Sequence, residues 1–448
     1  MSTLLPWNIE TELVKISHLG VTIGNEQKGR IIALPTSEVF HNQELISSFL
    51  NVLPANLDNG FQAHLYTTPS DSLVVYLHRV NDFLIEHALN CLKVNAEIWR
   101  TLTGIQLASN NFVIAFHQKS VSAAQIPPGI HLCQGSLLQV AINKAKETGK
   151  ALVAFVFNEQ FLQKSGIRLP KNSLIRDYSK TTTLLMDKNS SIKLLQKNGV
   201  PLPVTYFSPE IKKMDKTLKF VFKPSGGAAG LGVYLNEGKG ASLHEILLHI
   251  CYLKKNHLLP DNYQIQEFLP GPVYGALILF RPGKQPEILQ IHDQVINPKN
   301  KFIAGSWSRK TQSQKYNEVE KLVKQIATIK ELKFIGLMGI DLIDDKVIEI
   351  NPRLTASSPI SHLLHHENAI KDFLGLNFEI KRIDINTGIS IPQEMILSGR
   401  LKHTIFRIWK EHNVLILPQG LNPAGNSRIL FINDYSQNRA QQKFLKAI

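Results

Sequence analysis

Residues 334–358 read FIGLMGIDLIDDKVIEINPRLTASS and contain two short apolar segments on either side of a polar turn. The apolar segments are residues 335–343 and 347–350, and the turn is residues 344–346. Two apolar segments around a short polar turn predict a β-hairpin. We therefore expect two antiparallel strands here, with their side chains facing each other across the pair.

Three side chains that carry oxygen atoms share one face of this hairpin. Asp341 lies three positions before the turn and Glu349 three positions after it, so the two carboxylates are expected to face each other. Asn351 is two residues beyond Glu349, and side chains two apart on a strand point to the same face. Opposed carboxylates repel each other and are costly to bury alone, whereas a hard divalent cation binds such oxygen atoms. The pattern predicts a cation site.

A solvent-exposed hairpin with its acids in water is the alternative interpretation. It fits the neighbouring residues poorly, because the other face of both strands is apolar. These apolar residues are Ile340, Leu342, Ile348 and Ile350. Arg353 is two residues beyond Asn351 and so continues the alternation of Glu349 and Asn351. Its guanidinium is suited to bidentate binding of phosphate or carboxylate.

The composition is that of a globular chain with more than one domain. The chain has 448 residues, 43% hydrophobic and 19% charged, and this length exceeds one ordinary core. No apolar segment reaches the ~18 residues of a membrane-spanning helix, and residues 1–13 lack the pattern of a signal peptide. The three cysteines are widely spaced, which argues against a disulfide framework or a structural zinc site. We expect a cytoplasmic protein without a membrane partner.

The formal net charge of +14 suits nucleic acid, an anionic membrane or small anionic substrates. Lys and Arg are scattered along the chain and form no basic arm and no long block. Such scattering is typical of a solvated surface, so no nucleic acid partner is expected. The charge is consistent with the capture of a nucleotide and of acidic small molecules.

Short apolar strands alternate with helical patterns in residues 1–175, which predicts an open, mainly parallel α/β domain. One strand is expected within 14–25, others at 30–34, 73–77, 112–116 and 151–157, and helices at 82–100 and 136–147. A junction is expected between residues 166 and 180. Residues 383–448 are predicted to form a C-terminal α/β extension, to which no role is assigned, with strands at 405–409, 414–417 and 429–432 and a final polar helix.

A glycine-rich loop at residues 225–232 lies between two expected strands at 219–224 and 233–235. Four glycines in eight residues let the backbone approach phosphates closely, although glycine-rich hairpin turns are also common. A Walker loop does not fit, because Val233 stands where its first glycine is required. A Rossmann turn does not fit either, since strand-like residues follow the loop instead of a helix.

Two further patterns flank this loop. Residues 186–201 predict a helix that begins at polar residues and ends at Gly199, before Pro201. Residues 263–271 read YQIQEFLPG and predict a strand that leads into a Pro-Gly turn. A helix is expected at 315–332, immediately before the hairpin.

Taken in order, these segments resemble the ATP-grasp superfamily over residues 180–381. The resemblance rests on Met186-Asp187-Lys188 with Gly199-Val200-Pro201, on Phe222-Lys223-Pro224 with the glycine loop, on Gln266 to Gly271, and on Asp341 with Glu349-Ile350-Asn351-Pro352-Arg353. It implies an α/β (α+β) fold class. An ATP-grasp domain is expected over 176–382, preceded over 1–175 by an open, mainly parallel pre-ATP-grasp-like domain and followed by the extension 383–448.

The resemblance also implies roles for the matched residues. The phosphate-contacting set is Lys188, Lys223, Gly226, Gly227, Gly230 and Gly232. The adenine-binding hinge is Gln266, Glu267, Phe268 and Leu269, with the Glu267 side chain as the partner of the amino group. The Mg²⁺ ligands, with Mn²⁺ as the alternative ion, are Asp341, Glu349 and Asn351. Arg353 and Lys223 are the implied catalytic residues.

One position departs from the family pattern. Similar enzymes carry an acidic residue for the ribose hydroxyls shortly after the hinge, and Val273 stands at that position here. Tyr274 or Glu267 are the residues expected to compensate. The departure keeps open an ATP-binding protein with impaired catalysis.

The function that the resemblance implies is that of an ATP-dependent carboxylate-amine ligase. A carboxylate substrate would become an acyl phosphate, and an amine from an amino acid or peptide-like molecule would attack it, with release of ADP and phosphate. A small-molecule kinase of the same superfamily is the alternative. The expected partners are small carboxylates and amines, with Arg281, His292 and Ser306 as candidate contacts. The oligomeric state stays open, with a homodimer among the options.

Overall fold

The computed structural model describes twenty-seven segments of the chain, most of them beyond residue 184. They are residues 14–17, 20–23, 30–34, 73–77, 85–105, 112–115, 130–133, 147, 151–154, 174–175, 184–185, 187–208, 210, 219–225, 233–236, 248, 250–251, 262–280, 284–297, 302–332, 334, 336–352, 355, 357–375, 377–421, 427–434 and 439–448.

Six short strands of the N-terminal region form a parallel sheet in the order β6-β5-β4-β3-β7-β8. They are β3 (Arg30–Leu34), β4 (Leu73–Leu77), β5 (Phe112–Ala115), β6 (Ile130–Cys133), β7 (Ala151–Ala154) and β8 (Leu174–Ile175). The single strand expected within 14–25 is wrong. The chain reverses there, since β1 (Val14–Ser17) and β2 (Gly20–Ile23) pair antiparallel with Ser17 opposite Gly20.

A four-stranded antiparallel sheet follows in the order β11-β10-β12-β9. Its strands are β9 (Thr205–Phe207), β10 (Phe220–Pro224), β11 (Tyr234–Asn236) and β12 (Tyr263–Glu267). The helix α7 (Lys188–Lys197) precedes them and begins at Asp187, whose carboxylate accepts a hydrogen bond of 2.7 Å from Ser190 N. This cap satisfies one of the free amide groups at the helix start, so Lys188 is fixed as the first helical residue.

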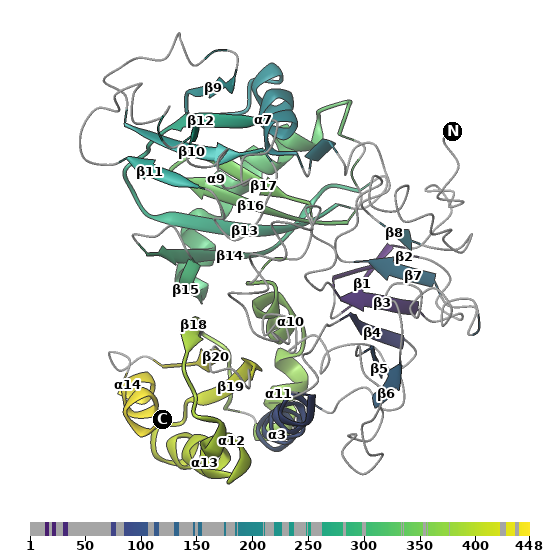
Figure 1. The fold of residues 1–448 in the computed structure, drawn as a ribbon, viewed down its shortest axis with the longest axis vertical. Coiled ribbons are helices and arrows are strands. Elements are labelled where there is room, and N and C mark those ends of the chain that lie inside the picture. The colour runs from purple at the N-terminus through teal and green to yellow at the C-terminus, as the bar shows by residue number, and fades with distance from the viewer. Residues whose placement is uncertain are drawn as a thin grey trace.

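The largest sheet has eight antiparallel strands in the order β17-β16-β13-β14-β15-β18-β20-β19. They are β13 (Val273–Phe280), β14 (Glu287–Ile296), β15 (Phe302–Ser308), β16 (Gly336–Ile343), β17 (Lys346–Asn351), β18 (Arg382–Ile389), β19 (Leu415–Gly420) and β20 (Ser427–Ile432). The predicted hairpin is confirmed as β16 and β17. Figure 1 shows this sheet running from the small sheet at the top to the C-terminal helices at the bottom.

The helix α9 (Arg309–Ala327) covers one face of the large sheet beside the hairpin. It begins six residues before the expected start at 315, because Ser308 caps it by accepting a hydrogen bond of 3.0 Å from Thr311 N. Its buried side chains pack with those of α7 and of strands β13, β16 and β17 in one apolar cluster. The apolar face of the hairpin is therefore packed into the core formed by the sheet and this helix.

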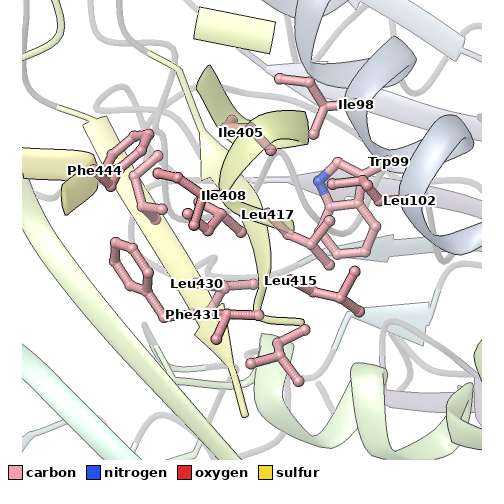
Figure 2. Packing of buried hydrophobic residues seen from close by; sticks show 14 of the residues in the cluster. Ile98, Trp99, Leu102, Ile405, Ile408, Leu415, Leu417, Leu430, Phe431 and Phe444 are labelled. Carbon is pink, nitrogen blue, oxygen red and sulfur yellow. The ribbon is translucent and has the colours of Figure 1, made fainter. Parts of the chain in front are cut away.

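A second apolar cluster lies at the other end of the large sheet. It joins strands β18, β19 and β20 to α10 (Pro359–His365), α11 (Glu367–Leu374), α12 (Gln393–Leu397), α13 (Arg400–His412) and α14 (Arg439–Ala447). The helix α3 (Ile85–Thr103) inserts Trp99 into this cluster, as Figure 2 shows. Trp99 Nε1 donates a hydrogen bond of 2.8 Å to Pro418 O. An N-terminal helix therefore packs into the C-terminal core.

The strand expected at 405–409 is wrong, because these residues lie inside α13. The apolar residues that suggested a strand are spaced for a helix instead. Leu401, Ile405 and Ile408 fall on one stripe and are buried against the C-terminal sheet. A short apolar segment is ambiguous between the two structures when its flanks are not considered.

The large sheet continues through residue 382 into the C-terminal segment, since β18 pairs with both β15 and β20. The segments 176–382 and 383–448 thus share one sheet while most of their apolar side chains form two clusters. The division of the chain at 175 and 382 stays a prediction. Among the described helices, none combines the length and the apolar character needed to cross a membrane.

Candidate active site

Two lysines contact the hairpin, one from the small sheet and one from helix α7. Lys223, on β10, donates a hydrogen bond of 2.9 Å from Nζ to the carbonyl oxygen of Ile348 on β17. Lys188 Nζ, at the start of α7, lies 3.7 Å from Glu349 Oε1. Both lysines are largely buried. Both lysines therefore contact the hairpin that carries the two carboxylates.

The hairpin places the predicted cation ligands on one face. Asp341 lies opposite Glu349 in the strand register, and Asn351 lies opposite Gly339 on the same face. Asn351 Nδ2 donates a hydrogen bond of 3.1 Å to Asp341 Oδ2. The predicted convergence of these three side chains is thus a feature of the structure, whereas their role as cation ligands stays a prediction.

The donor set fits a hard divalent cation. Two carboxylates and an amide oxygen are oxygen ligands of the kind that Mg²⁺ takes, usually with water and phosphate oxygens completing its shell. Within the described residues no group of three or more His, Cys, Asp or Glu side chains could hold a metal. The third predicted ligand is the Asn351 amide. A Cβ on Gly339 would lie 2.5 Å from Thr355 Cγ2, so the glycine lets Thr355 pack beside this face.

Burial changes the proton affinity of Lys223. The pKa of this lysine is lowered to about 8, mainly by desolvation and also by the nearby positive charge of Lys188, while Glu349 and Asp341 oppose the shift. A buried ammonium group with incomplete compensation gains from any further negative charge. Phosphate oxygens would supply that charge.

The β12 strand directs two amide side chains toward Lys223. Gln264 lies opposite Lys223 and Gln266 opposite Val221, so both amides share the face of the lysine. Both are buried, and neither Gln264 Oε1 nor Gln266 Nε2 has a hydrogen-bond partner among the described residues. The same holds for Asn189 Oδ1 on α7. Buried polar atoms without partners are rare in proteins and mark a site where a polar ligand fits, as a nucleotide would.

Glu267 does not point to this face. It is the next residue after Gln266 on β12, and its Oε2 lies 3.3 Å from Val204 N and 3.8 Å from Lys346 Nζ. Its own amide donates to Val204 O at 2.7 Å. Phe268 N donates to Lys219 O at 2.8 Å, and Leu269 is partly exposed. The geometry favours Gln266 over Glu267 as the hinge side chain that meets a nucleotide.

Val273 opens β13 and lies opposite Ile343, on the same face as Asp341. Tyr274 points the other way and is 2% exposed in the cluster beneath α9. Its hydroxyl donates to Asp344 O and contacts Glu318. Tyr274 therefore does not compensate for the missing acid at position 273.

The remaining predicted residues divide into two groups. The glycines 226, 227, 230 and 232, Arg353 and Arg281 lie outside the described residues. Ser306 lies opposite Asp293, on the face toward α9, so it does not reach the carboxylates. His292 does lie on the carboxylate face, opposite Gly275, and burial lowers the pKa of its ring to about 4.

One residue next to the carboxylates is absent from the predicted set. Gln294 Nε2 donates a hydrogen bond of 2.6 Å to Asp341 Oδ1 from the neighbouring part of β14. The sequence signal was an alternation, since Gln290, His292 and Gln294 are two residues apart. This alternation shows that the three side chains share one face of their strand, but it does not show which strands lie beside it.

A comparison with known families matches residues 185–357 to the ATP-grasp domain. Among solved structures the chain is similar to an L-amino acid ligase from Bacillus licheniformis, at 14% identity and a TM-score of 0.51 over 94% of this chain and 97% of that chain. No curated protein matches the chain.

Two further solved structures have the same arrangement. An N5-carboxyaminoimidazole synthase from Aspergillus clavatus, in complex with ADP and 5-aminoimidazole ribonucleotide, is 10% identical, with a TM-score of 0.53 over 94% of this chain and 98% of that chain. An N5-carboxyaminoimidazole synthetase from Staphylococcus aureus, complexed with ADP, is 14% identical, with a TM-score of 0.52 over 94% and 97%. Such identities show the fold alone. The family match covers the segment that holds both lysines and the paired carboxylates, so the chain contains an ATP-grasp domain over residues 185–357.

Proposed function

We propose that the protein is an ATP-dependent ligase that activates a carboxylate as an acyl phosphate and joins it to an amine. The observation that carries the proposal is the meeting of Lys188 and Lys223 with the opposed Asp341 and Glu349 carboxylates. Positive charge for phosphates and oxygen ligands for a cation are the two requirements of phosphoryl transfer. The solved structures named above include ligases and synthetases, which supports the class of reaction.

The chain's own residues would position the reactants. Lys188 and Lys223 would neutralise phosphate oxygens. Gln264 and Gln266 would hydrogen-bond the nucleotide from the face of the small sheet that they share with Lys223. Asp341, Glu349 and Asn351 would hold Mg²⁺. When bound, the ion would supply Lewis-acid stabilisation of the charge on the transferred phosphoryl group. Arg353, which follows the hairpin in sequence, would steady the same group.

The proposed reaction needs no nucleophile from the protein. A carboxylate oxygen of the substrate attacks the γ-phosphorus of ATP, and the bond from that phosphorus to ADP breaks. The amine nitrogen then attacks the acyl carbon, phosphate leaves, and the amine proton passes to solvent. The products are an amide, ADP and phosphate.

Incubation of the protein with ATP, Mg²⁺ and mixed carboxylates and amines tests this reaction. We expect ADP and phosphate in equal amounts, and only when both a carboxylate and an amine are present, because the acyl phosphate is consumed by the amine. Release of AMP would contradict the proposal. A stable phosphorylated small molecule would indicate a kinase, and ATP binding without turnover across the whole panel would indicate a binding protein.

A further inference from the structure

Three polar side chains line β14 beside the carboxylate pair. Gln290, His292 and Gln294 are two residues apart and therefore share one face of the strand. His292 lies opposite Gly275 on β13, and Gly275 in turn lies opposite Asp341 on β16. We call these three residues the β14 strip. It runs one strand away from the proposed cation ligands.

Gly275 leaves room for two side chains of the strip to lean toward Asp341. A Cβ at this position would lie 2.5 Å from Gln294 Nε2 and 2.8 Å from His292 Nε2. Both nitrogen atoms thus converge above the backbone of Gly275. Gln294 Nε2 already donates to Asp341 Oδ1, and its amide has a second N–H group. Two nitrogen atoms that meet next to a proposed cation site are well placed for a substrate carboxylate.

The tautomer of His292 supports a donor at this point. Gln290 Nε2 lies 3.5 Å from His292 Nδ1. An amide nitrogen donates only, so Nδ1 accepts and the proton of the neutral ring is on Nε2. Burial lowers the pKa of the ring to about 4, which keeps it neutral. The Nε2–H group then points over Gly275.

Gln290 provides an unpaired acceptor at the other end of the strip. Its side chain is 0% exposed, and Nε2 donates a hydrogen bond of 3.0 Å to Ser357 O. This contact fixes the orientation of the amide, because a carbonyl oxygen can only accept. Gln290 Oε1 is left without a hydrogen-bond partner among the described residues. An unpaired buried acceptor is unfavourable, and a ligand with an N–H group would satisfy it.

We propose that the β14 strip binds an α-amino acid as the substrate whose carboxylate is activated. The carboxylate lies at His292 and Gln294, beside Asp341, and the ammonium group donates to Gln290 Oε1. The Cα atoms of residues two apart on a strand are separated by about 6.7 Å, so one small molecule can reach both Gln290 and His292. The assignment rests on the proposed function, since that function makes a carboxylate the group that is phosphorylated.

Equilibrium binding by calorimetry, with Mg²⁺ and a non-hydrolysable ATP analogue present, tests the assignment without requiring turnover. The probes are L-amino acids and the same molecules without the amino group, for example L-alanine against propionate and L-phenylalanine against 3-phenylpropionate. We expect the best-bound amino acid to bind at least about tenfold more tightly than its deaminated partner, which corresponds to ~1.4 kcal/mol. In Gln290→Met this ratio should fall to near one, because the acceptor for the ammonium group is lost.

Gln314→Met is the matched control, because Gln314 is exposed on α9 and the chemical change is the same. Gly275→Ala is a second variant, and it should weaken both members of each pair by displacing His292 and Gln294. An unchanged ratio in Gln290→Met would overturn the assignment, and so would a wild-type protein that binds no amino acid of the panel. Amino acid binding without release of ADP would refute the ligase reaction alone. Equal turnover of amino acids and deaminated carboxylates would refute only the assignment of the β14 strip to an α-amino acid.

Discussion

Asp341→Asn is expected to lower kcat/KM for ATP turnover by about 10³, while the protein stays folded. The carboxylate of Asp341 faces Glu349 and accepts hydrogen bonds from Gln294 and Asn351. An amide at position 341 has one oxygen and no charge, so it binds a hard cation poorly. ADP release at increasing Mg²⁺ concentration is the measurement. The residual activity should require a higher Mg²⁺ concentration than the wild-type activity.

Asp345→Asn is the control for this variant, because Asp345 is an exposed acid in the turn of the same hairpin. It should keep wild-type activity and the wild-type dependence on Mg²⁺. The thermal midpoint of Asp341→Asn should stay within about 3 °C of the wild type, since relief of the repulsion with Glu349 offsets the altered hydrogen bonds. Normal activity of Asp341→Asn would remove this residue from the cation site.

The parts of the site that lie within one hairpin could be predicted from the sequence. The register of β16 and β17 follows from a short turn and a period of two, so the positions of Asp341, Glu349 and Asn351 needed no distant information. The same period separates Gln266 from Glu267 on β12, but the sequence does not say which face meets the hairpin. The family resemblance favoured Glu267, whereas the pairing of Gln264 with Lys223 turns Gln266 inward.

Contacts between distant strands could not be predicted in this way. Gln294 reaches Asp341 only because β13 lies between β14 and β16 in the sheet. The strand order depends on packing across the whole sheet, and no local pattern encodes it. The helix α13 shows the same limit, because its stripe is recognisable only when residues 400–412 are considered together. Trp99 likewise meets Pro418 through a core that no sequence motif marks.

Lys223→Met is expected to lower kcat/KM for ATP by about 10² to 10³ and to make the protein without nucleotide more stable at pH 7. The side chain is buried, and desolvation lowers its pKa to about 8, from an ordinary value near 10.4. Below pH 8 the lysine carries its charge in both the folded and the unfolded protein, and burial of that charge opposes folding. The cost is at most about 3 kcal/mol. About 1 kcal/mol is recovered by the hydrogen bond to Ile348 O.

Methionine keeps the volume and removes the charge, so the variant should gain about 2 kcal/mol at pH 7, the difference between these two terms. Between pH 8 and about 10.4 the unfolded wild-type protein binds more protons at this residue than the folded one. The stability of the wild type therefore rises with pH in that window by about 3 kcal/mol. The advantage of Lys223→Met should disappear and become a disadvantage of about 1 kcal/mol near pH 10.4, because the variant lacks the hydrogen bond to Ile348 O. Urea unfolding of both proteins from pH 7 to 10.5 measures the difference. Lys219→Met, a change at an exposed lysine beside the same strand, should show neither effect. A Lys223→Met protein that is less stable than the wild type at pH 7 would contradict this prediction. It would mean that the attraction of the Glu349 and Asp341 carboxylates for the lysine exceeds the cost of its desolvation, and that the lysine stabilises the protein without nucleotide.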